Sequence, residues 1–127
     1  MSSTKSTLGF FNEKLTEFFK DLVYAFPEEK DLKLALEYIE FAKKSNPRLI
    51  LDMFYENIYV GAHELIEQED EIGLLAFSKS KIETQYNELS SALLVFDKHW
   101  QAMDSQNRDV IWKYVKVLCI LCEKARR

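Results

Sequence analysis

Turn-forming residues are scarce in this chain, whose 127 residues include only 3 glycines and 2 prolines. A β-sandwich or β-barrel needs a turn roughly every 8–12 residues, and these two residue types supply many of those turns. Apolar side chains recur instead at steps of three and four residues, which is the period of one helix face. The sequence therefore predicts an all-α fold, and the length predicts a single domain.

The two prolines divide the first half of the chain into three predicted helices. Residues 8–25 form the first, because Pro27 disfavours helical geometry in the residue before it. Residues 28–44 form the second, with acidic side chains in its first turn and lysines in its last, as the helix dipole favours. The third covers 47–67, with Asn46 as its predicted side-chain cap and a proline at its first position.

The middle of the chain is less regular. Gly61 weakens or kinks the third helix without ending its apolar period. The acidic run at 67–71 is interpreted as a solvated turn, and Gly73 soon after it predicts a break in the chain. Residues 74–77 are too short an apolar stretch to distinguish a helical turn from extended packing. A short helix is predicted from about Thr84 onward.

The last predicted helix begins at the capping pair Asp104-Ser105 and ends near Lys124. It is apolar over most of its circumference, so neighbouring helices must surround it. We therefore predict one compact bundle of five or six helices over residues 8–127, with this helix at its centre and residues 1–7 as a disordered tail.

Two apolar stripes run along this last helix. The longer one is predicted to face the core, and it contains Val110, Ile111, Tyr114, Val117, Leu118 and Leu121. That leaves Trp112, Val115 and Cys119 on the second stripe as the candidate contact face for a partner protein, including a second copy of this chain. The alternative is that both stripes are buried, and a small domain has few helices with which to cover them.

Charge is unevenly distributed along the chain. Residues 97–127 hold four acidic and seven basic side chains, a net charge of +3, whereas the whole chain has a net charge of -4. The basic residues of this segment define a weak nucleic-acid alternative: Lys98, Arg108, Lys113, Lys116, Lys124, Arg126 and Arg127. Their density is far below that of the basic stripes that bind phosphate backbones, so nucleic acid is not the expected partner.

The N-terminal residues, the lack of a long apolar stretch and the two cysteines predict a cytoplasmic protein. The first seven residues are small and polar, unlike a signal peptide, and no window approaches the roughly 18 apolar residues of a membrane span. Cys119 and Cys122 form a Cys-x-x-Cys pattern, but near the end of a helix, where the dipole disfavours a thiolate. Buried structural cysteines are therefore expected, and His63 and His99 lack the paired spacing of a zinc site.

One acidic cluster is compatible with metal-dependent chemistry. Glu64, Glu67 and Glu71 share a helix face if the helix continues, and such carboxylates could hold Mg²⁺ in an all-α nucleotide hydrolase. A second carboxylate helix would be required, and Glu37 and Glu40 lie opposite the apolar face of theirs. The segment from His63 to Glu67 lacks the second histidine of the His-Glu-x-x-His motif. No cofactor is predicted, and an enzyme is the less favoured class.

Several segments resemble small uncharacterised all-α proteins of nucleocytoplasmic large DNA viruses, the giant viruses of algae and other protists. The resemblance rests on residues 11–15, 26–31, 46–48 and 99–118, and residues 73–86 depart from it. It implies a viral protein that acts in the cytoplasm of an infected cell or in the virion, and it implies no catalytic residue. The sequence thus predicts a non-enzymatic helical protein that acts through protein–protein interaction.

Overall fold

The computed structural model describes residues 6–127. The predicted tail, residues 1–7, therefore lies outside the described residues except for its last two. Ser6 caps the first helix, because its Oγ accepts a hydrogen bond from the backbone N of Gly9 at 3.0 Å, and Thr7 is the first helical residue.

The described part of the chain is all-α, as predicted, and contains no strand. Four helices each consist of a single α-helical segment: α1 (Thr7–Ala25), α2 (Lys30–Ser45), α5 (Glu71–Thr84) and α7 (Ser105–Arg126). A fifth is continuous over α3 (Pro47–Phe54), the π-helical η1 (Tyr55–Tyr59) and α4 (Val60–Glu67). A sixth joins α6 (Ser91–Leu94), the π-helical η2 (Val95–His99) and the 3₁₀ turn η3 (Trp100–Ala102).

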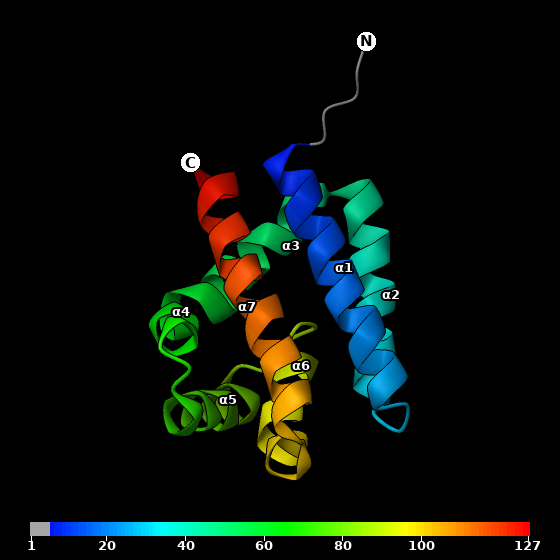
Figure 1. Ribbon diagram of the computed structural model, residues 1–127. Helices are drawn as coiled ribbons and strands as arrows, with labels where there is room; N and C mark the ends of the chain where they lie inside the picture. The colour runs from blue at the N-terminus through cyan, green and yellow to red at the C-terminus, as the bar shows by residue number, and fades with distance from the viewer. Residues whose placement is uncertain (1–5) are drawn as a thin grey trace.

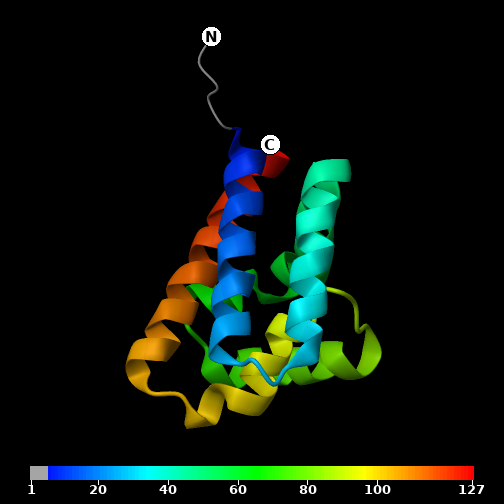
Figure 2. The same ribbon diagram turned by 90° about the vertical axis from the view of Figure 1, so that its right-hand side faces the viewer.

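α1, α2 and α7 stand side by side, and the α3–η1–α4 helix, α5 and the α6 segment pack against them (Figure 1). α1 and α2 are neighbours, and α7 lies antiparallel to α1 and separates it from α4, as predicted for a central last helix. Helices do not surround α7 on all sides, however, because its face at Val110, Val117 and Ile120 is exposed. α5 and the α6 segment cross the end of the molecule opposite the C-terminus (Figure 2). No helix in the described chain is both long enough and apolar enough to cross a membrane.

Aromatic side chains fill the centre of the bundle. Phe11 and Phe54 meet edge to face with ring centroids 5.2 Å apart, which fixes α1 against α3. Trp100 meets Trp112 in the same manner at 5.3 Å, which fixes η3 against α7. All four side chains are buried, so the two ends of the chain share one core.

The start of α3 differs from the predicted cap. Pro47 occupies the first helical position as expected, but the side chain of Asn46 makes no capping hydrogen bond. The nearby buried polar contact comes from α1, where Asn12 Nδ2 donates to the carbonyl of Pro47 at 3.0 Å. The helix then continues through Gly61, as predicted. A Cβ at that position would lie 2.5 Å from Cε1 of Phe77, so the glycine lets α5 approach α4 closely.

The predictions for residues 67–90 are wrong in two places. The helix breaks at residues 68–70, within the acidic run predicted as a turn, and Glu69 there adopts a positive φ of 51°. The further break predicted at Gly73 does not occur. Gly73 lies in the first turn of α5 and donates its N–H to the capping carboxylate of Asp70 at 2.9 Å. Thr84 ends α5 where a new helix was predicted to begin, because α5 has no single apolar face to mark its extent.

The predicted orientation of the two apolar stripes of α7 is wrong in part. Ile111 and Leu118 are buried as predicted, but Val110 is 49% exposed and Val117 is 39% exposed. The second stripe turns toward the core, since it faces both the aromatic cluster at Trp100 and the helix η1–α4.

Candidate functional site

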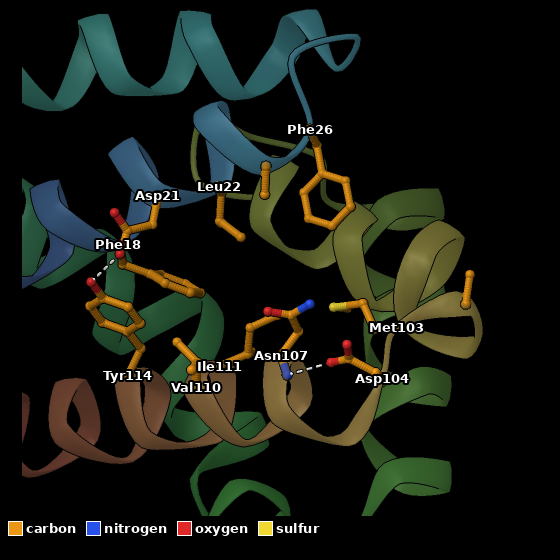
Figure 3. Close-up of a pocket in the computed structure, with 12 residues that line it drawn as sticks. Phe18, Asp21, Leu22, Phe26, Met103, Asp104, Asn107, Val110, Ile111 and Tyr114 are labelled. Atoms are coloured by element: carbon orange, nitrogen blue, oxygen red, sulfur yellow. Dashed lines mark hydrogen bonds between the residues drawn. The ribbon is translucent and has the colours of Figure 1, made fainter.

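A cavity of about 500 Å³ opens at the seam between α1 and α7 (Figure 3). The second half of α1 forms one wall, the first half of α7 forms the other, and the turn at Ala102–Asp104 closes one end. Its lining is mainly apolar and comprises Phe18, Leu22, Ala25, Phe26, Ala102, Met103, Val110, Ile111, Tyr114 and the polar residues Asp21, Asp104 and Asn107.

Helical spacing explains why these residues share one hollow. The α1 wall contributes residues 18, 21, 22 and 25, and the α7 wall contributes 107, 110, 111 and 114. Both sets follow the i, i+3, i+4, i+7 rule, which places their members on one face of each helix. The buried members, among them Phe18 and Ile111, form the floor, while Val110 stands at the rim.

Two carboxylates lie at opposite ends of the cavity (Figure 3). Asp21 accepts a hydrogen bond from the Tyr114 hydroxyl, and Asp104 Oδ1 accepts one from the backbone N of Asn107 at 2.8 Å. Burial and the adjacent Asp21 carboxylate raise the pKa of the Tyr114 hydroxyl well above its usual value, so this residue stays a neutral donor.

A shallower hollow of about 220 Å³ continues the seam toward the C-terminus of α7. It shares Val110 and Tyr114 with the main cavity and adds Lys14, Lys113 and Val117. Together the two hollows form one groove along the seam, which we call the α1/α7 groove. Its α7 rim exposes the apolar side chains of Val110 and Val117.

The predicted contact face is buried, which is the outcome that the alternative interpretation predicted for this stripe. Trp112, Val115 and Cys119 are all buried in the core, with Trp112 only 4% exposed. They contact the interior of their own domain and are not presented to a partner. Val110 and Val117 are exposed on α7 instead, although their spacing predicted that they face the core. Helical spacing shows which residues share a face, but it does not show whether that face is covered.

The predicted carboxylate cluster does not form. Glu64 and Glu67 are exposed on α4. Glu71 lies after the turn at residues 68–70, at the start of α5, and pairs with Arg108 at 3.6 Å. Glu37 and Glu40, the proposed second set, lie on α2, on the far side of α1 from α4 (Figure 1). This arrangement gives no support to a metal-dependent nucleotide hydrolase.

Four of the seven basic residues in the nucleic-acid alternative are paired with carboxylates. Lys98 pairs with Glu29, Arg108 with Glu71, Lys116 with Glu69 and Arg126 with Asp52. Arg126 also lies 3.6 Å from the ring centroid of Tyr55. Such pairing reduces the positive charge available to a phosphate backbone, so this alternative is disfavoured as well.

The two cysteines are buried free thiols, which agrees with the structural role predicted for them. Burial raises the pKa of Cys119 to about 12 and that of Cys122 to about 11. A thiol with a pKa of about 12 is ionised to roughly one part in 10⁴ at pH 8, so neither side chain is a ready nucleophile or metal ligand.

Thiol labelling checks this state of the cysteines. At pH 8 we expect an aromatic disulfide reagent to modify the folded protein at least about 100-fold more slowly than the urea-unfolded protein, because the thiolate is the reactive form. Val117→Cys supplies an exposed thiol on the same helix as a positive control. Equal rates for the native thiols and Cys at 117 would contradict the burial.

Among the described residues, one group of side chains has the composition of a metal site: Glu28, Glu29 and His99. Glu29 is already bound, because its carboxylate lies 2.7 Å from His99 Nε2 and 3.0 Å from Lys98 Nζ. The ammonium opposes a second cation there, and His99 also stacks on Phe26 with centroids 4.5 Å apart. We interpret the group as an ion-pair network that fixes the start of α2 to η2.

This network predicts a specific acid sensitivity. Hydrogen bonds from His99 and Lys98 lower the pKa of Glu29 below its ordinary 4.5. The resulting stabilisation is present in full above pH 4.5 and is lost as the pH falls through the lowered pKa. Glu29→Gln is expected to lower the free energy of unfolding by about 1 kcal/mol at pH 7 and to flatten its decline between pH 5 and 3.

Urea unfolding followed by circular dichroism across this pH range measures the effect. Glu37→Gln is the matched control, since its carboxylate is exposed on the same helix and lies outside this network. A decline of equal steepness in wild type and Glu29→Gln would show that the network does not stabilise the fold.

Comparison with known proteins finds no matching family model, no matching curated protein and no matching solved structure. The resemblance to proteins of giant viruses therefore stays a prediction, and the functional argument depends on the geometry of this chain.

Proposed function

We propose that this protein is a non-enzymatic helical module that binds another protein through the α1/α7 groove. The observation that supports this most strongly is the exposed apolar rim, Val110 and Val117, directly beside a cavity of about 500 Å³. Concave apolar surface with a few placed polar groups is typical of sites that receive an anchor side chain from a partner. The resemblance to giant-virus proteins adds the infected cell or the virion as the place of action.

Affinity purification of three forms of the protein tests the proposal. The first is the wild type, the second carries Val110→Glu and Val117→Glu in the groove, and the third carries Leu34→Glu and Ile72→Glu on α2 and α5. All four positions are exposed, so each pair is expected to change the free energy of unfolding by less than about 0.5 kcal/mol per residue. Proteins retained by the wild type and the third form should be lost from the groove variant.

The same variants distinguish a foreign partner from a second copy of the chain. Sedimentation equilibrium of the purified wild type is expected to give a monomer, because exposed apolar groups in the groove are few and a stable dimer buries about 1,600 Å² in total. A dimer that the groove variant dissociates would make the partner a second copy. Identical sets of captured proteins for all three forms would contradict the proposed function.

A further inference from the structure

The main cavity of the α1/α7 groove has a pronounced chemical bias. Three aromatic rings line it, from Phe18, Phe26 and Tyr114, and so do two carboxylates, from Asp21 and Asp104. Among the described residues that line this cavity, none is a lysine, an arginine or a histidine. An apolar hollow with negative charge at both ends favours an occupant that combines an apolar body with a positive charge.

Nearby cations do not neutralise these carboxylates. Lys14 and Lys113 line the adjoining shallow hollow and not this cavity. Lys14 Nζ lies 5.8 Å from the ring centroid of Tyr114 and pairs with Glu17 at 3.3 Å. Arg108 on the first turns of α7 points away to Glu71 and to the carbonyl of Trp100. The charge that faces the cavity therefore remains negative.

Asp21 is the better placed of the two carboxylates to receive a cation. The Tyr114 hydroxyl holds one of its oxygens, and an ionised carboxylate offers about four acceptor sites, so capacity for further donors remains. The rings of Phe18 and Tyr114 lie next to it with centroids 5.0 Å apart (Figure 3). Asp104 already serves as the cap of α7.

Arginine matches this arrangement in each respect. Its planar guanidinium stacks on aromatic rings and donates paired hydrogen bonds to a carboxylate, and its stem covers apolar surface. We propose that the partner protein inserts an arginine side chain into the cavity, with the guanidinium at Asp21 and against the ring of Tyr114. This inference rests on the proposed function and specifies the chemistry of the partner.

A pair of isosteric probes tests the preference for a cation. Phenethylguanidinium and phenethylurea have the same shape and differ by one positive charge. Titration followed by the NMR signals of Val110 and Ile111 should show that the guanidinium binds about tenfold more tightly. Asp21→Asn keeps an acceptor for Tyr114 but removes the charge, and it should reduce the ratio to within about twofold.

Asp31→Asn is the matched control for this variant. Asp31 also accepts a hydrogen bond from a tyrosine, Tyr86, but it lies on α2 outside the cavity. The tenfold preference should persist in Asp31→Asn. Equal affinity of the two probes for the wild type, or equal loss of the preference in both variants, would overturn the inference.

A second probe pair tests whether the cation belongs to a polypeptide. Two amphipathic helical peptides are used that differ only in one central residue on the apolar face, arginine or citrulline. The arginine peptide should bind more tightly than phenethylguanidinium and should shift the signals of Val117, which lies outside the main cavity. An arginine peptide that binds no more tightly than the small probe would overturn the partner's arginine in favour of a small organic cation.

The two proposals fail in different ways. Loss of the charge preference, with capture of partners still abolished by Val110→Glu and Val117→Glu, would overturn the arginine inference alone. A charge preference that persists while that groove variant captures the same proteins as the wild type would overturn the proposed function, and the cavity would then be a site for a small organic cation.

Discussion

Trp112→Ala is expected to lower the free energy of unfolding by about 3–5 kcal/mol, the cost of truncating a large side chain in a packed core. The indole is buried and packs against Trp100 at 5.3 Å and Phe96 at 6.2 Å. Its removal leaves a cavity between η2–η3 and α7 that the rigid surrounding helices fill only in part.

Urea unfolding monitored by circular dichroism measures this loss without relying on tryptophan fluorescence. Val117→Ala is the control on the same helix and should cost less than about 1 kcal/mol, because its side chain is partly exposed. A cost below about 1 kcal/mol for Trp112→Ala would mean that this side chain is at the surface and would restore the contact face expected from the sequence.

Removal of α7 is expected to abolish cooperative unfolding. A chain that ends at Met103 lacks the buried side chains of α7, which are Ile111, Trp112, Val115, Leu118, Cys119 and Cys122. Without them α1 loses its most extensive neighbour, and the apolar faces of α1 and α4 become exposed to water. Thermal melting followed by circular dichroism should show a broad, non-cooperative change.

A milder truncation provides the comparison for this result. A chain that ends at Ala125 keeps all the apolar residues of α7 that pack on the core and loses only surface contacts such as the Arg126–Asp52 ion pair at 3.3 Å. Such a pair contributes about 0–1 kcal/mol, so this chain should still melt sharply. A sharp melt for the chain that ends at Met103 would show that α7 is peripheral to the core.

Helix boundaries with a local chemical cause could be predicted from the sequence. Pro27 and Pro47 set the ends of the first three helices, and the Asp104 carboxylate caps α7 where the sequence places it. Each of these signals acts within one helical turn and does not depend on the rest of the fold.

Features set by packing between distant segments could not be predicted in the same way. α5 lacks one apolar face, so its extent depends on contacts with α4 and α6. The orientation of α7 depends on the aromatic cluster at Trp100 and on the position of α1. The spacing of apolar residues within α7 gives no information about either of them. The α1/α7 groove follows from that orientation, and this is why Val110 and Val117 were expected inside and Trp112 outside.

Site-specific photo-crosslinking tests the central claim, that the α1/α7 groove is the contact surface of this protein. Benzoylphenylalanine is introduced at Val117 on the groove rim or at Ile72, which is 83% exposed on α5. In cells that produce the protein, we expect covalent capture of a discrete partner from position 117 and none from position 72. Capture of the same partner from position 72, with none from position 117, would show that the partner binds outside the α1/α7 groove.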